Sequence, residues 1–287
     1  MTRLLLLLTV CVGLAGCQPE KGNAVEETID WKSLEFTCVK EPVPLLDKEA
    51  DHWFKSARAI EKGERPGTNA QMIELYEKAV ARNHPKAIVN LSGIYANGDG
   101  VEPDERKAVE LLERGMDMNF PLAYYNMGAY LSQGIGVKQD KVAAMAYFRK
   151  AADLGNPAAQ YAVGDRLTDI FAVSPDREKG FPIAIQMLEC ALSQGFAKAG
   201  IMLGSIYFVG EKNTERGLFY YQKAAALGDG QALYTLQTTF EEGKYGVTKD
   251  SRRAACYKRL SDELNADETK KFPNIDRICP LPPKPLP

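Results

Sequence analysis

The chain is poor in the residues that most often carry catalysis or bind metals, and it has no surplus of positive charge. Among its 287 residues only His52 and His84 are histidines, and 36 lysines and arginines stand against 38 aspartates and glutamates. A chain without a basic excess is ill suited to neutralise a phosphate backbone. Neither histidine is spaced from other ligands as in a zinc site. We therefore predict no nucleic-acid partner and no metal.

Motifs of catalysis and of phosphate binding are missing as well. The sequence contains no Gly-x-Ser-x-Gly elbow, no Walker loop and no His-Glu-x-x-His. The glycine pairs Gly98–Gly100 and Gly134–Gly136 would join helix to helix, whereas a phosphate loop joins a strand to a helix. His84 falls in a predicted turn and His52 on a predicted helix. We therefore predict a protein that binds no cofactor and is not an enzyme.

The one long apolar run lies at the N-terminus. It follows Arg3 and is shorter than the roughly 20 residues that a membrane-spanning helix needs. A basic start, a short apolar core and small residues after it are typical of an export signal. The run ends at Leu14-Ala-Gly-Cys17, which resembles the lipobox at which bacterial prolipoproteins are acylated on cysteine and cut before it. The resemblance implies a signal peptide over residues 1–16 and a lipidated, palmitate-bearing Cys17.

The residues after Cys17 indicate where the mature protein resides. Residues 17–33 are polar and lack helical periodicity, so we predict a flexible tether. Gln18 follows the cysteine, and by resemblance to Gram-negative lipoproteins this favours the outer membrane. Cleavage removes Arg3 and no acidic residue, so the mature charge is 35 − 38 = −3. We predict a protein anchored to the bilayer through Cys17 and facing the periplasm.

Four of the six cysteines remain once Cys11 is lost with the signal and Cys17 is lipidated. Disulfides persist outside the cytoplasm, and four cysteines allow three pairings. Cys256 lies on the last predicted helix and Cys279 in the tail after it, so we favour Cys256–Cys279. The remaining pair is then Cys38–Cys190.

A repeat organises the middle of the chain. The segment Ala87–Leu91 returns as Ala123–Met127, and Gly98–Val101 as Gly134–Val137, in both cases 36 residues later. Further copies open at Ala159, Ala199 and Ala232, and Ala50 begins a leading copy. Apolar residues recur at steps of three and four, and each copy contains glycines suited to helix ends. Each copy therefore predicts two helices.

This pattern, met best by residues 123–157, resembles the Sel-like repeats, relatives of the tetratricopeptide repeats. The resemblance covers about residues 50–260 and implies an all-α fold, a right-handed α-solenoid of about six helix-turn-helix repeats. The third copy departs from the pattern through an insertion at residues 171–180, and the fourth keeps only Gly210 of its glycines. We expect residues 34–49 to cap the N-terminal face and residues 261–287 to form a C-terminal extension with a proline-rich tail.

A solenoid offers a concave face that the first helix of each repeat lines. By analogy with tetratricopeptide geometry, the third residue of each copy faces this groove, and His52 holds that place in the leading copy. Acidic residues make the late half of the groove negative. The alternative is that the tyrosines of this set pack between repeats and contribute only to stability. The predicted partner-binding residues are Val89, Tyr125, Tyr161, Asp165, Asp169, Ile201, Tyr234 and Glu241.

These features predict a lipid-anchored scaffold that binds another protein. By architecture the chain resembles immunity lipoproteins that neutralise lipase toxins delivered by type VI secretion, and this is the function we favour. A structural adaptor of an envelope assembly or secretion machine is the alternative. A cell-wall glycan-acting enzyme is a weaker one, because acid pairs need no sequence motif.

Overall fold

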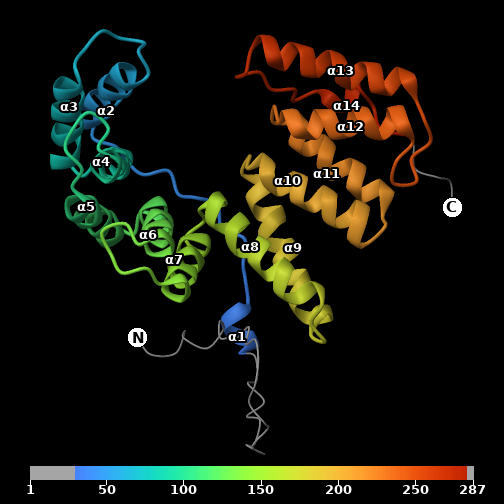
Figure 1. Cartoon of the computed structure of the whole chain (residues 1–287), viewed down its shortest axis with the longest axis horizontal. Helices are drawn as coiled ribbons and strands as arrows, with labels where there is room; N and C mark the ends of the chain where they lie inside the picture. Colours follow the sequence, from blue (N-terminus) through green and yellow to red (C-terminus); the bar gives the residue numbers. More distant parts are fainter. Residues whose placement is uncertain (1–29, 283–287) are drawn as a thin grey trace, which may run out of the picture. The chain divides into compact units, whose positions relative to one another are not determined.

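The computed structural model describes residues 30–282, and this part of the chain consists of helices and turns without a β-strand (Figure 1). The predicted signal peptide, Cys17, most of the tether and the last five residues of the tail lie outside the described residues. None of the described helices combines the length and the apolar character needed to cross a membrane.

Twelve of the described helices form six consecutive antiparallel pairs, as the repeat predicts. The short helices α1 (Trp31–Leu34) and α14 (Ile275–Ile278) flank them, and a π-helical turn, η1 (Ile206–Gly210), extends α10. The pairs are α2 (Lys48–Glu61) with α3 (Asn69–Ala81), α4 (Pro85–Asn97) with α5 (Glu105–Asp117), α6 (Pro121–Gln133) with α7 (Lys141–Asp153), α8 (Pro157–Ala172) with α9 (Arg177–Ser193), α10 (Ala197–Ser205) with α11 (Thr214–Ala226), and α12 (Gly230–Glu242) with α13 (Ser251–Ala266).

Local sequence signals set the ends of these helices. Helices α4, α6 and α8 start at proline, whose missing N–H would have no partner in a first turn. The side chain of Asn156 caps α8 by accepting the backbone N–H of Ala159 at 2.9 Å. Gly98 and Gly134 end α4 and α6 in the left-handed conformation, with φ of 74° and 82°. The repeated glycines are therefore helix punctuation.

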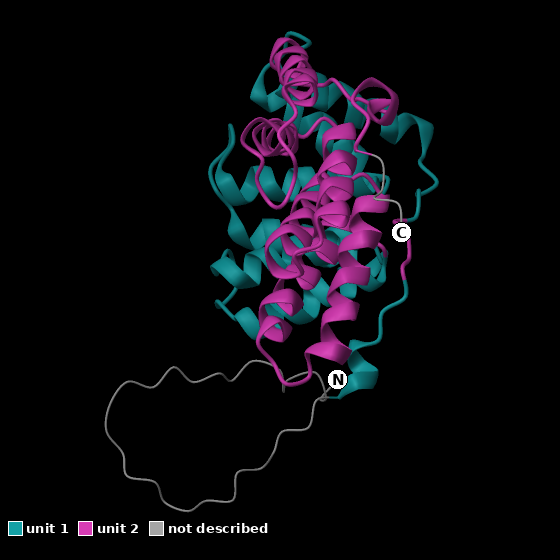
Figure 2. Ribbon diagram, turned by 90° about the vertical axis from the view of Figure 1, so that its right-hand side faces the viewer, with its two compact units in different colours: residues 1–37, 42–154 teal, residues 38–41, 155–287 magenta. Residues whose placement is uncertain are grey.

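The chain divides into two compact units (Figure 2). Unit 1 comprises residues 1–37 and 42–154, and unit 2 comprises residues 38–41 and 155–287. In both units the opening alanine of each described repeat is fully buried, which lets the paired helices approach closely. Around these alanines lie fully buried leucines such as Leu91 and Leu112 in unit 1 and Leu203 and Leu233 in unit 2. Burying each leucine contributes about 1.5–3 kcal/mol.

Residues 34–41, here called the N-terminal strap, form hydrogen bonds with helices from the middle of the array. In unit 1, Arg149 of α7 donates hydrogen bonds to the carbonyl oxygens of Leu34, at 3.4 Å, and Glu35, at 2.5 Å. In unit 2, Gln160 of α8 donates to the carbonyl oxygen of Val39 at 2.9 Å. Asp47, the N-cap of α2, accepts a hydrogen bond from the backbone N–H of Ala50 in the first helix pair. Backbone contacts of an extended segment leave no periodic pattern in the sequence, so these contacts with the middle of the array could not be predicted.

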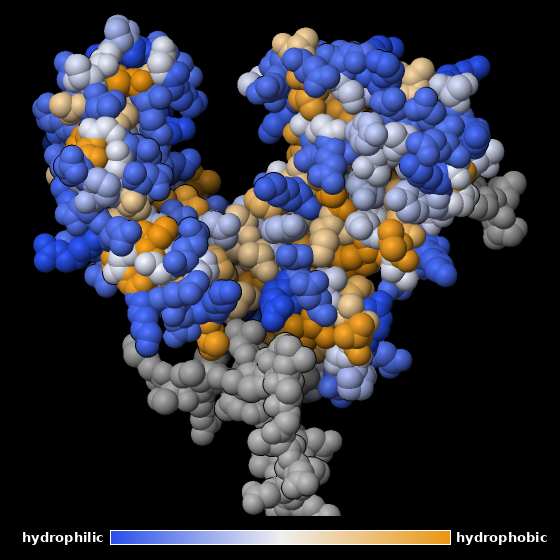
Figure 3. Space-filling model, viewed as in Figure 1, coloured by the Kyte–Doolittle hydropathy of each residue, from blue (hydrophilic) through white to orange (hydrophobic). Residues whose placement is uncertain are grey.

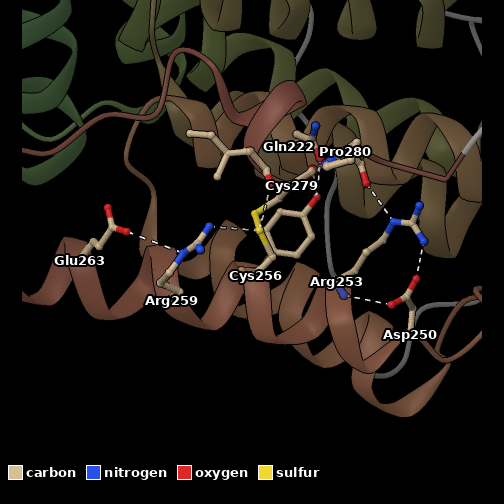
Figure 4. The surroundings of a disulfide bond; sticks show 10 residues. Gln222, Asp250, Arg253, Cys256, Arg259, Glu263, Cys279 and Pro280 are labelled. Atoms are coloured by element: carbon tan, nitrogen blue, oxygen red, sulfur yellow. Dashed lines mark hydrogen bonds and ion pairs between the residues drawn. A yellow bond between two sulfur atoms is a disulfide. The ribbon is translucent and has the colours of Figure 1, made fainter.

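Two disulfides lie within unit 2, and both follow the pairing favoured from the sequence. Cys38 of the strap bonds to Cys190 of α9, and Cys256 of α13 bonds to Cys279. Figure 4 shows the second bond, beside which Arg253 donates to the carbonyl oxygen of Pro280 at 2.9 Å. Each disulfide thus fastens a segment that lies outside the helix pairs.

Candidate protein-binding surface

The predicted binding residues of unit 1 differ in how much surface they offer. Val89 on α4 is only 6% exposed and belongs to the core cluster of unit 1. Its assignment to a partner-binding face is therefore corrected, because a valine packed on its own core has no area left for another protein. Tyr125 on α6 is half-buried, and its ring centroid lies 5.3 Å from that of Phe148 on α7. Tyr125 therefore packs within its own repeat and keeps part of its ring at the surface.

In unit 2, helix α8 brings a tyrosine and two aspartates onto one face. Tyr161, Asp165 and Asp169 are spaced by four residues, which aligns their side chains along the helix. The Tyr161 ring lies 5.2 Å from that of Phe196, the residue before α10, and is half-buried. Asp165 is half-buried and Asp169 is exposed. The face is aromatic at one end and acidic along its length.

Burial and mutual repulsion define the electrostatics of this face. Burial raises the pKa of the Asp165 carboxyl, and the neighbouring charge of Asp169 raises it further. Burial likewise raises the pKa of Tyr161, with a smaller effect from Asp165. Within residues 30–282 no lysine or arginine contributes to the shift at Asp165. A cation from outside would therefore stabilise the ionised pair, so the face favours a basic group on its partner.

The first helices of the last two pairs add a more open surface. Ile201 on α10 is half-buried and packs against the core of unit 2. Tyr234 on α12 is 63% exposed, and Glu241 is exposed near the end of the same helix. The alternative that the tyrosines only pack between repeats therefore describes Tyr161 in part, whereas Tyr125 packs within its own repeat and Tyr234 is largely exposed. Exposed tyrosine beside carboxylates suits protein recognition, because tyrosine contributes large contact area to binding hot spots.

Sequence reasoning missed a groove on the other helices of unit 2. It has a volume of about 540 Å³ and is lined by residues of α9, η1 and the start of α11. Two signals marked the place. One is the insertion at residues 171–180, which includes the start of α9, and the other is the loss of the Gly-x-Gly-Val pattern in the fourth copy, where η1 forms. Among residues 30–282 no cluster of histidine, cysteine, aspartate or glutamate could hold a metal ion.

A stack of helix pairs that presents a partly exposed aromatic and acidic face is a protein-binding scaffold. Four consecutive segments, residues 85–120, 121–156, 157–196 and 197–229, match the model of the Sel1 repeat. The chain belongs to the Sel1 repeat family. The first and last helix pairs lie outside the matched segments but repeat the same architecture.

Solved structures from Pseudomonas aeruginosa are similar to this chain over most of its length. Immunity protein PA5088 is 30% identical, with a TM-score of 0.69, and the match covers 87% of this chain and 95% of that one. Immunity protein Pa5087 is 33% identical, with a TM-score of 0.66 and coverage of 88% and 96%. PA5086 is 31% identical, with a TM-score of 0.64 and coverage of 87% and 96%. No curated protein matches the chain by sequence.

Proposed function

We propose that this chain is a lipid-anchored immunity protein that faces the periplasm and neutralises a lipase-type effector delivered by type VI secretion. The observation that carries the proposal is its similarity, over 87% and 88% of its length, to two solved structures named as immunity proteins. An immunity protein acts by binding its toxin, and a Sel1 repeat array is a binding scaffold. Inhibition of this kind requires no catalytic step by the scaffold itself.

The disulfides and the N-terminus support an extracytoplasmic location. Both Cys38–Cys190 and Cys256–Cys279 need an oxidising compartment to form and persist. The lipobox-like Leu14-Ala-Gly-Cys17 provides a route to the periplasm and a membrane anchor. Gln18 after the cysteine favours the outer membrane over the inner one.

Neutralisation in this proposal depends on meeting the toxin before it reaches lipid. Acylation of Cys17 would confine the scaffold to the surface that a lipase attacks, and this raises its effective concentration there. We assign the effector to the face formed by Tyr161, Asp165 and Asp169 on α8 and Tyr234 on α12. The tyrosines provide apolar contact area, and the carboxylates attract a basic patch and speed the encounter.

A rescue assay tests the proposal. Each gene next to the one that encodes this chain is expressed with an export signal, with and without the full-length protein, and survival and phospholipid hydrolysis are measured. We expect one neighbour to be toxic and lipolytic and the full-length protein to protect against it. Deletion of residues 1–16 should abolish protection, and Cys17→Ala should weaken it because the scaffold is then no longer confined to the membrane surface.

Two outcomes would contradict the proposal. The immunity assignment fails if no exported neighbour is toxic, or if the protein lacking residues 1–16 protects equally well from the cytoplasm. A stable complex with resident envelope proteins would then favour the structural adaptor. A toxic neighbour that leaves phospholipids intact would keep the immunity assignment and refute the lipase.

A further inference from the structure

Unit 2 carries a groove that the proposed function does not use. Its floor is apolar and comes from Phe181 and Ile185 on α9 and Tyr207 on η1, with Glu189 and Arg177 among the charged residues at its edge. Arg177 lies over the ring of Phe181, 3.9 Å from its centroid. Figure 3 shows apolar patches over α8 and α9 on a mainly hydrophilic face. The groove follows α9 toward its end, and Gly195 is the second residue after that helix.

The chain itself shows how an equivalent turn, one repeat later, is covered. Residues 267–282, the described part of the C-terminal extension that follows α13, cross the turn after α11. A Cβ atom at Gly228 would lie 2.3 Å from the carbonyl oxygen of Lys270, so only glycine allows the crossing. Next to it, the backbone N–H of Phe272 donates to the carbonyl oxygen of Ala226 at 2.8 Å. The extension is thus held at this turn by backbone contacts.

From the turn the C-terminal extension continues along α11. Gln222, six residues before Gly228, donates to Asp276 at 2.6 Å. Phe272 and Ile275 are buried in the core cluster of unit 2, and Cys279 ends the path in its disulfide. A short segment therefore binds a helix pair in three ways. It crosses the turn at the glycine, it makes a polar contact with the residue six positions before that glycine, and it buries apolar side chains.

The N-terminal strap repeats these features at an earlier turn. A Cβ atom at Gly155, after α7, would lie 2.6 Å from the backbone carbon of Lys40, so this crossing also requires glycine. Arg149, six residues before Gly155, binds the carbonyl oxygens of Leu34 and Glu35. Two separate segments of the chain thus use the same two positions of a repeat.

At the repeat between them, the glycine of the turn is open. Gly195 is exposed, and a Cβ atom there would meet only the side chain of Leu227, at 4.0 Å. Six residues earlier stands Glu189, which is exposed and accepts a hydrogen bond from Tyr220. Glu189 lines the groove whose floor is Phe181, Ile185 and Tyr207. The turn at Gly195, the polar side chain of Glu189 and the apolar groove therefore follow one another along α9. No described segment lies across Gly195.

We propose that an extended segment of the protein partner docks along α9, crosses Gly195, places a basic residue against Glu189 and inserts an apolar side chain into the groove. The residue at the polar position determines which group the partner must supply. Arg149 donates to carbonyl oxygens and Gln222 donates to a carboxylate, whereas the carboxylate of Glu189 can only accept and therefore calls for a donor. The apolar floor matches the use of Phe272 and Ile275 by the C-terminal extension. The identity of the partner in this inference rests on the proposed function. The groove adds a second binding surface to the face on α8 and α12.

The experiment uses the full mature chain and the toxin recovered in the rescue assay. Gly195→Asn keeps a residue that tolerates the left-handed conformation, as Asn83 and Asn119 do at the turns of unit 1 with φ of 56° and 52°. Glu189→Gln removes the charge and keeps an oxygen that can accept the hydrogen bond from Tyr220. We expect each variant to melt as the parent does and to bind the toxin about tenfold or more weakly, the loss expected for a charge-assisted contact. Gly63→Asn, at an equally open left-handed glycine, and Glu102→Gln, at an exposed loop, are the matched controls.

Hydrogen exchange gives a second readout. The backbone amides of residues 193–197 should gain protection in the toxin complex and not in the free protein. Equal toxin binding by the parent and both variants, or unchanged exchange at this turn, overturns the docking inference and leaves the immunity assignment intact. Failure of the parent itself to bind any exported toxic neighbour overturns the proposed function and the inference with it.

Other occupants of the groove are separate outcomes. Protection of residues 193–197 in the free protein that is lost when residues 283–287 are deleted would assign the groove to the chain's own tail. Protection that grows with protein concentration would assign it to a second copy of the chain. Either result overturns a docking site for the toxin.

Discussion

The Cys38–Cys190 bond should contribute more to the stability of the fold than any other covalent link within the described residues. It closes a loop with a sequence separation of 152, whereas Cys256–Cys279 closes one of only 23. A cross-link stabilises a protein mainly by reducing the conformational entropy of the unfolded chain, and the effect grows with loop length. Replacing each pair by alanine, in separate variants, compares the two loops in one protein.

The loop-closure relation supplies the magnitudes. A sequence separation of 152 corresponds to a stabilisation of the folded state by about 5 kcal/mol at 25 °C, and a separation of 23 to one of about 3.4 kcal/mol. Cys190 and Cys279 are both buried, so truncation to alanine removes a comparable side chain at each site. We therefore expect the Cys38→Ala and Cys190→Ala double variant to lose about 1.7 kcal/mol more than the Cys256→Ala and Cys279→Ala variant.

Equilibrium unfolding in guanidinium chloride measures the difference. Helix content is followed by circular dichroism, and the oxidised parent is compared with both double variants and with the reduced parent. The reduced parent should be the least stable of the four proteins. A larger loss from the Cys256 and Cys279 pair, or equal losses, would refute the loop-length argument and assign the stabilisation to local packing of the C-terminal extension.

Three further predictions concern other residues. His84 caps α4 through Nδ1 and is buried, and burial lowers its pKa despite Asp51 at 3.6 Å. The free energy of unfolding should therefore have its full value above the usual histidine pKa of about 6.5. It should fall as the pH drops below that value, by at most about 1.4 kcal/mol per pH unit. His84→Asn keeps a side-chain cap of the kind that Asn156 provides and should flatten this dependence of stability on pH. Thermal melts at about pH 7.5 and about pH 5.5 measure it. An unchanged pH dependence would show that His84 is not the group that titrates. Tyr161→Ala with Tyr234→Ala should weaken toxin binding by about 2 kcal/mol or more in calorimetry with little change in melting temperature. Normal binding or outright unfolding of this double variant would refute the assignment of the face on α8 and α12. Gly228→Ala should destabilise the protein, because its Cβ would meet the carbonyl oxygen of Lys270. Gly63→Ala, whose Cβ meets no atom, should lose only the free energy of the backbone strain. Equal losses of stability in denaturant melts would contradict the close crossing of the C-terminal extension over Gly228.

The parts of the fold that could be predicted are those with a period. Alanines such as Ala123 and Ala159 recur because each must be small to let two helices meet, and glycines such as Gly98 and Gly134 recur because each ends a helix with positive φ. The cysteine pairing followed from the order of elements at the C-terminus. Such constraints repeat at every copy, so a single sequence reveals them.

The parts that escaped prediction have no period. The strap binds through the carbonyl oxygens of Leu34 and Val39, and any residue supplies a carbonyl. Val89 was assigned by analogy to an open face, but in its repeat that position packs on the core. The groove arises where η1 replaces a glycine-ended helix, so a departure from the pattern, rather than the pattern itself, marked it.

The strap disulfide also determines where tension on the chain is felt. A pull on the N-terminus first meets the hydrogen bonds between Arg149 on α7 and the carbonyl oxygens of Leu34 and Glu35. Once these bonds break, the disulfide from Cys38 to Cys190 passes the force directly to α9. Helices α2 to α8 all lie inside the closed loop between the two cysteines and then carry none of that force. A protein held to a membrane by its N-terminus while a bound partner pulls on its C-terminal helices would therefore begin to yield between α9 and α13, with its first repeats still folded.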